Sequence, residues 1–298
     1  MTRIAHAACL VLVCLAAARP AAAEVVVQDF LGHDVRLPQP AERIVALAPH
    51  LAENLYSAGA GAQLVGTVAH SDYPPAAKQV PRVGGYTSVS LEAVVAQKPD
   101  LVVAWASGGV ATRAMLDRLR ALGIPVYVDK PEKPADIARA IVDLGVLSGH
   151  AERARRVATD FRARLAALRQ RYMDRTPVSM FYQVWDEPLQ TLSGKQIISH
   201  VIRLCGGRNI FADAVSLAPR ISIESVLDRD PQAIVASGMG NERPEWLDDW
   251  QSWPGLKAVE NGDLYFVPPD LIQRASVRIL DGASRLCEQL QTVRERDD

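Results

Sequence analysis

Runs of apolar residues along the chain predict short buried strands that alternate with helices. Residues 101–105 read LVVAW and residues 124–129 read IPVYVD, and a helix is predicted between them over 111–122, ending before Gly123. Strands that are apolar on both faces are typical of parallel sheets, because helices cover both sides of such a sheet. The pattern therefore predicts an α/β architecture with a parallel sheet.

The same strand, with the helix before it, occurs twice in the chain. Residues 90–105 (SLEAVVAQKPDLVVAW) align without a gap to residues 222–237 (SIESVLDRDPQAIVAS), and the two share a serine, a glutamate, a proline and several apolar positions. In each copy the serine can cap a short helix, which stops before the proline and leads into a buried strand. After the second copy, residues 250–261 are expected to form the next helix and residues 264–268 (LYFVP) the next strand. The repeat predicts two α/β lobes, each with its own parallel sheet.

A single long helix is predicted between the lobes. Its apolar positions recur every three or four residues and so form one face; they are Ala154, Val157, Ala158, Phe161, Leu165, Leu168 and Tyr172. Ser148 is expected to cap its start, and Pro177 ends it. The predicted domains are an N-terminal lobe at 24–147, the connecting helix at 148–176 and a C-terminal lobe at 177–298.

The first residues of the chain have the pattern of a cleaved signal peptide. Arg3 precedes an apolar stretch at 4–18, and three alanines at 21–23 supply small residues for cleavage before Glu24. No later stretch approaches the ~20 apolar residues that a membrane span needs. We therefore expect residues 1–23 to be removed from an exported protein; the alternative is an N-terminal membrane anchor.

Charge and cysteine content narrow the functional classes. The chain has 34 acidic and 33 basic residues, and two of the basic ones, Arg3 and Arg19, would leave with the signal peptide. A slightly acidic chain without basic patches is not expected to bind nucleic acid or anionic membranes. Cys205 and Cys287 are the only cysteines after residue 23. In an oxidising compartment two cysteines favour one disulfide, with a pair of free buried thiols as the alternative.

The ends of the predicted strands indicate where a ligand would bind. Ligands of open parallel sheets lie beyond the carboxyl ends of the strands, where Trp105 and residues 107–109 follow one strand and residues 237–240 follow its counterpart. If these two edges face each other, they form a cleft between the lobes, a common place for small-molecule sites. Trp105 is then expected to face the ligand; the alternative is a tryptophan that only closes the edge of its lobe.

Enzyme motifs are absent from the sequence. It contains no G-x-S-x-G elbow, no G-x-x-x-x-G-K-[ST] phosphate loop and no G-x-G-x-x-G after a strand. The histidines are scattered, without the close pairs typical of zinc sites. These observations favour a binding protein that needs no cofactor over the alternative, a periplasmic enzyme.

Five segments resemble a known family. They are VGTVAHSDYPP at 65–75, RVGGYTSVSLEAVVAQKPDLVVAW at 82–105, SGK at 193–195, LCGGRNIF at 204–211 and DLIQRASVRIL at 270–280. The chain resembles the periplasmic substrate-binding proteins of ABC importers for metal chelates, in particular the cobalamin-binding members. The resemblance implies a periplasmic, monomeric receptor without enzymatic activity, which holds a corrinoid between two lobes and delivers it to a membrane permease. Haem or a ferric siderophore is the alternative ligand.

The resemblance also implies roles for individual residues. Glu92 and Glu224, one per lobe, match the glutamates that dock on permease arginines, and Cys205 and Cys287 match the family's cysteine pair. His70 stands where imidazole could be an axial ligand of the metal; a hydrogen bond from His70 to the ligand is the other interpretation. The implied ligand-lining residues are His70, Tyr73, Tyr86, Trp105, Trp185, Gln190, Ala218, Asp270 and Arg274.

Overall fold

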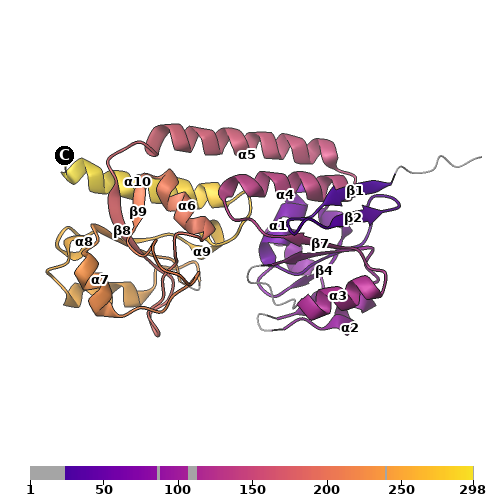
Figure 1. Ribbon diagram of the computed structural model, residues 1–298, viewed down its shortest axis with the longest axis horizontal. Coiled ribbons are helices and arrows are strands. Elements are labelled where there is room, and N and C mark those ends of the chain that lie inside the picture. Colours follow the sequence, from indigo (N-terminus) through magenta and orange to yellow (C-terminus); the bar gives the residue numbers. More distant parts are fainter. Residues whose placement is uncertain (1–23, 86–87, 107–112, 239, 298) are drawn as a thin grey trace, which may run out of the picture.

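The computed structural model of the chain describes residues 24–85, 88–106, 113–238 and 240–297. It consists of two α/β lobes side by side, with the long helix α5 (Ala151–Tyr172) along one side of both (Figure 1). Each lobe contains one parallel sheet. The predicted fold class, two parallel-sheet lobes joined by one long helix, is therefore confirmed.

The N-terminal lobe is built on a five-stranded sheet in the order β5-β4-β3-β6-β7, in which every pair is parallel. A two-stranded antiparallel hairpin, β1 and β2, precedes it. The strands are β1 (Val25–Gln28), β2 (Asp34–Leu37), β3 (Ile44–Ala46), β4 (Leu64–Val68), β5 (Arg82–Gly84), β6 (Leu101–Trp105) and β7 (Val126–Asp129). The helices are α1 (Pro49–Ala58), η1 (Gly61–Gln63), η2 (Pro75–Gln79), α2 (Leu91–Ala96), α3 (Arg113–Ala121) and α4 (Pro134–Leu147).

The C-terminal lobe has a four-stranded sheet in the order β11-β10-β8-β9, again with parallel pairs. Its strands are β8 (Val178–Gln183), β9 (Gly207–Asn209), β10 (Ala233–Ala236) and β11 (Leu264–Phe266). Its helices are α6 (Ile197–Leu204), α7 (Ile223–Arg229), η3 (Glu245–Ser252), α8 (Lys257–Glu260), α9 (Pro269–Ile272) and α10 (Ile279–Asp297).

One predicted helix of this lobe was wrong. Residues 250–261 do not form a single helix, because η3 ends at Ser252 and α8 begins only at Lys257. Pro254 and Gly255 lie between them, and a proline there removes a backbone donor while a glycine lowers the helix propensity. The segment therefore turns between two short helices before β11.

The internal repeat is confirmed at the level of capping. The Ser90 hydroxyl accepts a hydrogen bond from the Ala93 amide (3.1 Å) at the start of α2, and Ser222 accepts one from Ser225 (3.3 Å) at the start of α7. These bonds satisfy amides that an uncapped first turn would leave without a partner. The strands that follow, β6 and β10, occupy inner positions of their sheets, as their apolar sequences predict.

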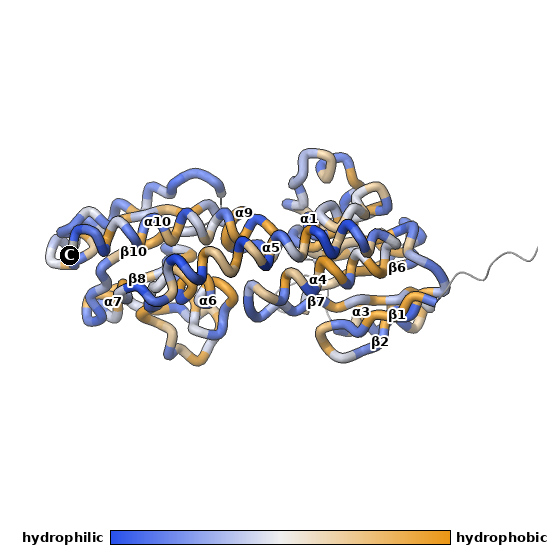
Figure 2. The backbone as a smooth tube through the Cα atoms, turned by 90° about the horizontal axis from the view of Figure 1, so that it is seen from above, coloured by the Kyte–Doolittle hydropathy of each residue, from blue (hydrophilic) through white to orange (hydrophobic). Residues whose placement is uncertain are grey.

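The start of the connecting helix differs from the prediction. Ser148 does not cap α5: its hydroxyl donates to the Leu144 carbonyl (2.7 Å) at the end of α4, and the residue before α5 is His150. Gly149, with φ +78°, makes the turn between the two helices. Because α4 and α5 meet at this tight turn, α5 lies directly on α4 and runs over the junction of the lobes (Figure 2).

The two lobes share one hydrophobic core. The largest cluster of buried apolar side chains includes Val103 and Tyr127 from the first sheet, Tyr182 from the second, and Phe161 from α5. A disulfide between Cys205, just after α6, and Cys287 in α10 lies within this cluster, with a Cα–Cα distance of 4.6 Å. The shared core and the cross-link favour a stiff assembly over one in which the lobes swing freely.

Candidate ligand-binding site

The predicted ligand-lining residues follow the carboxyl ends of parallel strands in both lobes. In the N-terminal lobe His70 and Tyr73 come after β4, and Trp105 is the last residue of β6. In the C-terminal lobe four of them come after β8 or β11: Trp185, Gln190, Asp270 and Arg274. Ala218 is exposed in the segment between β9 and α7. Tyr86, residues 107–109 and Met239 lie outside the described residues.

The Trp105 ring packs against His50, which pairs with Asp129. The partly buried Trp105 ring meets the His50 imidazole edge to face, with 5.2 Å between ring centroids and an interplanar angle of 83°. His50 Nε2 lies 3.1 Å from Asp129 Oδ2, and both side chains are buried. Since Trp105 and Asp129 are register partners on β6 and β7, the sheet itself places the carboxylate beneath the tryptophan. The pair limits how far the Trp105 ring can turn.

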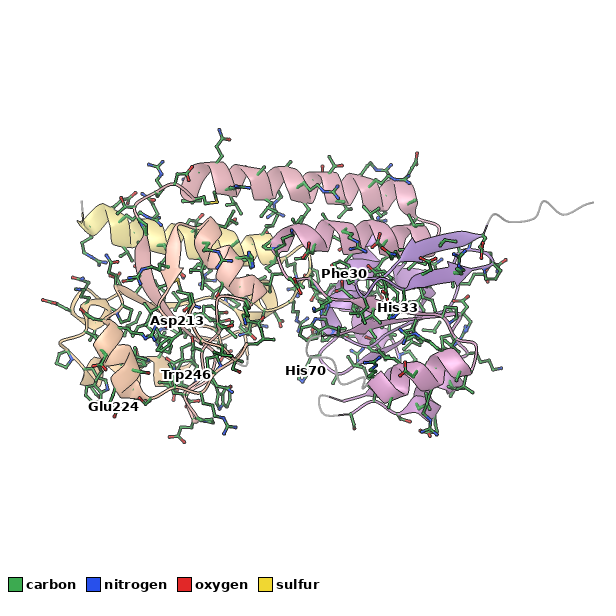
Figure 3. The ribbon with its side chains drawn as sticks, viewed as in Figure 1. Phe30, His33, His70, Asp213, Glu224 and Trp246 are labelled. Carbon is green, nitrogen blue, oxygen red and sulfur yellow. A yellow bond between two sulfur atoms is a disulfide. The ribbon has the colours of Figure 1, made fainter. Side chains whose placement is uncertain are left out.

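His70 is exposed on the side of its lobe that faces the other lobe (Figure 3). Its backbone is in the left-handed region, with φ 62°, which few non-glycine residues adopt. A buried hydrogen bond from the Thr67 hydroxyl to the Ser71 hydroxyl (2.9 Å) fixes the turn on either side of it. Strained residues are concentrated at functional sites, so this conformation agrees with the predicted role of His70.

In the C-terminal lobe, Trp185 and Gln190 belong to one compact loop after β8. The Val184 amide donates to the Gln190 carbonyl (2.9 Å), and the Gln190 amide donates to the Trp185 carbonyl (3.1 Å). The Trp185 indole N–H donates to the Glu187 carbonyl (2.9 Å). Trp185 and Gln190 are both partly buried in this loop.

A buried carboxylate that the sequence analysis missed joins the two lobes. Glu53, on α1, is 2% exposed and accepts four hydrogen bonds from the C-terminal lobe. Its Oε1 accepts from Arg274 Nη1 (2.8 Å) and Arg278 Nη2 (2.6 Å), and its Oε2 accepts from the Ser276 hydroxyl (2.7 Å) and Arg278 Nε (3.0 Å). Arg278 therefore binds Glu53 in the bidentate geometry that is strongest for this pair.

Arg274 is shared among three carboxylates. Besides Glu53, it contacts Asp72 of the N-terminal lobe (3.3 Å) and Asp270 of its own lobe (2.6 Å). Asp270 also accepts a hydrogen bond from Asn241 (2.9 Å). The predicted ligand-binding pair Asp270–Arg274 is thus part of an inter-lobe ion network.

Arg278 completes the network beneath an exposed aromatic ring. Its guanidinium carbon lies 3.9 Å from the centroid of the Tyr73 ring. Tyr73 is a predicted ligand-lining residue and is 43% exposed. Desolvation by burial lowers the pKa of Arg278, but the hydrogen bonds and charge of Glu53 raise it more, so the net shift is upward. Arg278 stays charged and keeps Tyr73 in place.

Trp246 is a second residue that the sequence analysis missed, after Glu53. It lies in η3 after the carboxyl end of β10, and Figure 3 labels it in the C-terminal lobe. A Cβ atom at Gly238 would lie 3.0 Å from its Cζ2 atom, so the glycine permits the ring to pack on the strand end. Trp246 is partly buried. No local pattern distinguished it from the neighbouring Trp250 and Trp253.

The two predicted docking glutamates have matching environments. Glu92 and Glu224 are exposed in the first turns of α2 and α7, which lie on the side of the molecule away from α5 (Figure 1). The pKa of each is lowered, mainly by a backbone hydrogen bond and next by the capping serine, Ser90 or Ser222. Both carboxylates are therefore ionised at neutral pH.

No group of three or more His, Cys, Asp or Glu side chains that could hold a metal ion occurs in the described part of the chain. None of its helices, within the same described ranges, is both long and apolar enough to cross a membrane. Two cavities, of about 540 and 600 Å³, lie at the edge of the C-terminal sheet and beside α5 and α6, and contain none of the predicted ligand-lining residues.

Known proteins match this chain over most of its length. A family model described as "Periplasmic binding protein" matches residues 44–271. The vitamin B12-binding protein of Vibrio campbellii is 37% identical over 261 residues, covering 86% of this chain and 92% of that protein. The crystal structure of the periplasmic vitamin B12-binding protein of Vibrio cholerae has a TM-score of 0.79 at 36% identity and covers 86% of this chain and 99% of that one. A periplasmic heme-binding protein from Roseiflexus has a TM-score of 0.74 at 22% identity, with coverages of 85% and 99%, and shares the fold.

Proposed function

Because the chain belongs to the periplasmic binding protein family of ABC importers, we propose that it captures a corrinoid, cobalamin or cobinamide, and delivers it to an importer in the inner membrane. Relatives named for vitamin B12 binding, 37% and 36% identical over most of the chain, support this ligand. The observation in the molecule that carries the proposal is the network around Arg274, in which carboxylates outnumber guanidinium groups.

The charges of this network favour amide-bearing ligands. Among the described residues, the carboxylates of Glu53, Asp72 and Asp270 form ion pairs with two guanidinium groups, those of Arg274 and Arg278. The side-chain amides of a corrin can donate to the carboxylates and accept from the guanidinium N–H groups. The propionates of haem would instead meet excess negative charge, and like charges at close range weaken binding. The network therefore favours a corrinoid over haem.

Trp105 is expected to contribute much of the binding energy. A tryptophan supported by His50 presents a rigid apolar face to a corrin, and removal of such a ring costs ~2 kcal/mol, or about 30-fold in Kd. We expect Trp105→Ala to weaken cobinamide binding by about that factor in equilibrium dialysis.

The control for this variant is Trp253→Ala, which removes an exposed tryptophan outside the predicted site. It should leave the affinity for cobinamide unchanged, and the ligand recovered from either protein should be chemically unaltered. Wild-type affinity in Trp105→Ala would exclude Trp105 from the site. Recovery of a chemically modified ligand would show that the protein is an enzyme and contradict the proposed function.

His70 is proposed to face the metal side of the ligand. Cobinamide lacks the base that occupies one axial position in cobalamin, so an imidazole can approach its cobalt. Axial coordination by His70 should shift the absorption spectrum of bound cobinamide toward that of a nitrogen-ligated form, and His70→Ala should abolish the shift. If the native complex shows no shift, His70 lines the site without binding the metal.

A further inference from the structure

Helix α1 carries an unusual set of buried polar side chains. His50, Glu53 and Asn54 are 4%, 2% and 0% exposed. They share the helix with Leu51 and Leu55, which belong to the apolar core. Burying such groups is costly unless each has a partner. Their presence on one short helix therefore calls for a specific reason at this place in the fold.

All three side chains bind segments that carry predicted ligand-lining residues. His50 supports Trp105, and the Asn54 amide donates to the carbonyl of Ala275 (3.0 Å), the residue after Arg274. Glu53 accepts its four hydrogen bonds from Arg274, Ser276 and Arg278. Helix α1 thus fixes the site residues of one lobe relative to those of the other.

Glu53 has the largest influence, because its carboxylate pairs with two guanidinium groups. Side chains of Arg274 and Arg278 are 13% and 12% exposed, so little solvent screens them. With Glu53 ionised, each has a buried carboxylate partner. Without that charge, Arg274 would retain its ion pairs with Asp72 and Asp270, while Arg278 would retain its contact with the Tyr73 ring and the more distant charge of Asp270.

We propose that Glu53 is a positioning residue that sets the ligand selectivity of the site: by holding Arg274 and Arg278, it prevents these guanidinium groups from binding carboxylates of a ligand. The inference rests on the proposed function, since it concerns which side chains of a corrin the site accepts. Glu53 itself does not contact the ligand. It acts through Arg274, Arg278 and, beyond them, Tyr73.

Two corrins with the same ring provide the test. Cobinamide carries amide side chains, and cobyrinic acid carries carboxylates in their place. The Kd of each is measured by calorimetry for the wild type and for Glu53→Gln, which keeps the shape of the side chain and removes its charge. We expect the ratio of the Kd for cobyrinic acid to that for cobinamide to fall at least tenfold in Glu53→Gln. A loss of stability alone would weaken the binding of both ligands and leave the ratio of their Kd values unchanged.

The matched control is Asp263→Asn. Asp263 is another fully buried carboxylate with an arginine partner, Arg296, and it accepts a hydrogen bond from Tyr265 (2.7 Å) near the end of α10. Its replacement should lower stability without changing the ratio. If Glu53→Gln does not fold, Asp72→Asn decides, because it removes an exposed carboxylate from the same Arg274 and should shift the ratio in the same direction.

The outcomes separate the two claims. If the wild type binds cobinamide and the ratio is the same in the variant, Glu53 does not set selectivity and the inference is overturned, while the proposed function stands. If the wild type binds neither corrin, the proposed function fails and the inference falls with it. A ratio that also shifts in Asp263→Asn would assign the change to general destabilisation and likewise overturn the inference.

Discussion

The double substitution Glu92→Lys and Glu224→Lys is expected to abolish ligand uptake through the importer, while the affinity for the ligand stays at the wild-type value. We propose that each glutamate meets a cation on the importer, one per lobe; the reversed charges would then repel it at two places. Both side chains are exposed and ionised in equivalent first turns. The measurement is uptake of labelled cobinamide into proteoliposomes that contain the cognate importer, with calorimetry for affinity.

The matched control reverses two other exposed glutamates in first turns, Glu152 on α5 and Glu260 on α8. This variant should transport normally, because its net charge equals that of the test variant but the changed residues lie elsewhere. Each single variant, Glu92→Lys or Glu224→Lys, should retain partial uptake. Normal uptake by the double variant would remove both glutamates from the docking surface.

Replacing Cys205 and Cys287 by alanine is expected to lower the free energy of unfolding by about 4 kcal/mol. The disulfide joins positions 82 residues apart, so it restricts a long segment of the unfolded chain, and the effect grows with the length of that segment. Both residues are fully buried within the core shared by the lobes. Urea denaturation of wild type and variant measures the difference.

Two controls accompany this variant. The wild type under reducing conditions should unfold at nearly the same urea concentration as the variant, and the affinity for cobinamide should change little because neither cysteine is a predicted site residue. Mass analysis of the native protein should find no free thiol. Two reactive thiols in the native protein, or equal denaturation midpoints for the oxidised wild type and the variant, would contradict a stabilising disulfide.

Much of the fold could be predicted because its signals are local. The apolar runs of β6 and β10 and the serines that cap α2 and α7 are each contained in a few residues, and the repeat doubled the evidence for them. The family membership was predicted from five motifs and is confirmed by a family model over residues 44–271. Members of that family are substrate-binding proteins, so the prediction of a binding protein rather than an enzyme is confirmed as well.

The residues that sequence analysis missed depend on distant contacts. Glu53 lies in a short helix beside the polar residue Asn54, and polar residues of a helix ordinarily occupy its exposed side. Its partners are more than 200 positions away in the other lobe, with sequence separations of 221 for Arg274 and 225 for Arg278. Only the packing of α1 against the segment after α9 reveals that the carboxylate is buried and paired.

The prediction for Ser148 failed for a related reason. A serine before a helical stretch can bond forward to that helix or back to the preceding one, and the sequence does not distinguish the two. The tight turn at Gly149 places Ser148 at the end of α4, where its hydroxyl reaches Leu144. The roles of His70 and the other ligand-lining residues stay predictions that binding measurements must test.

The central claim is that this protein binds a corrinoid in preference to other metal chelates. Calorimetric titration of the purified protein with cobinamide, cobalamin and haem tests it most directly. We predict saturable binding of one corrinoid per protein, at least 100-fold tighter than any binding of haem. Tighter binding of haem, or no heat of binding with either corrinoid, would contradict the claim.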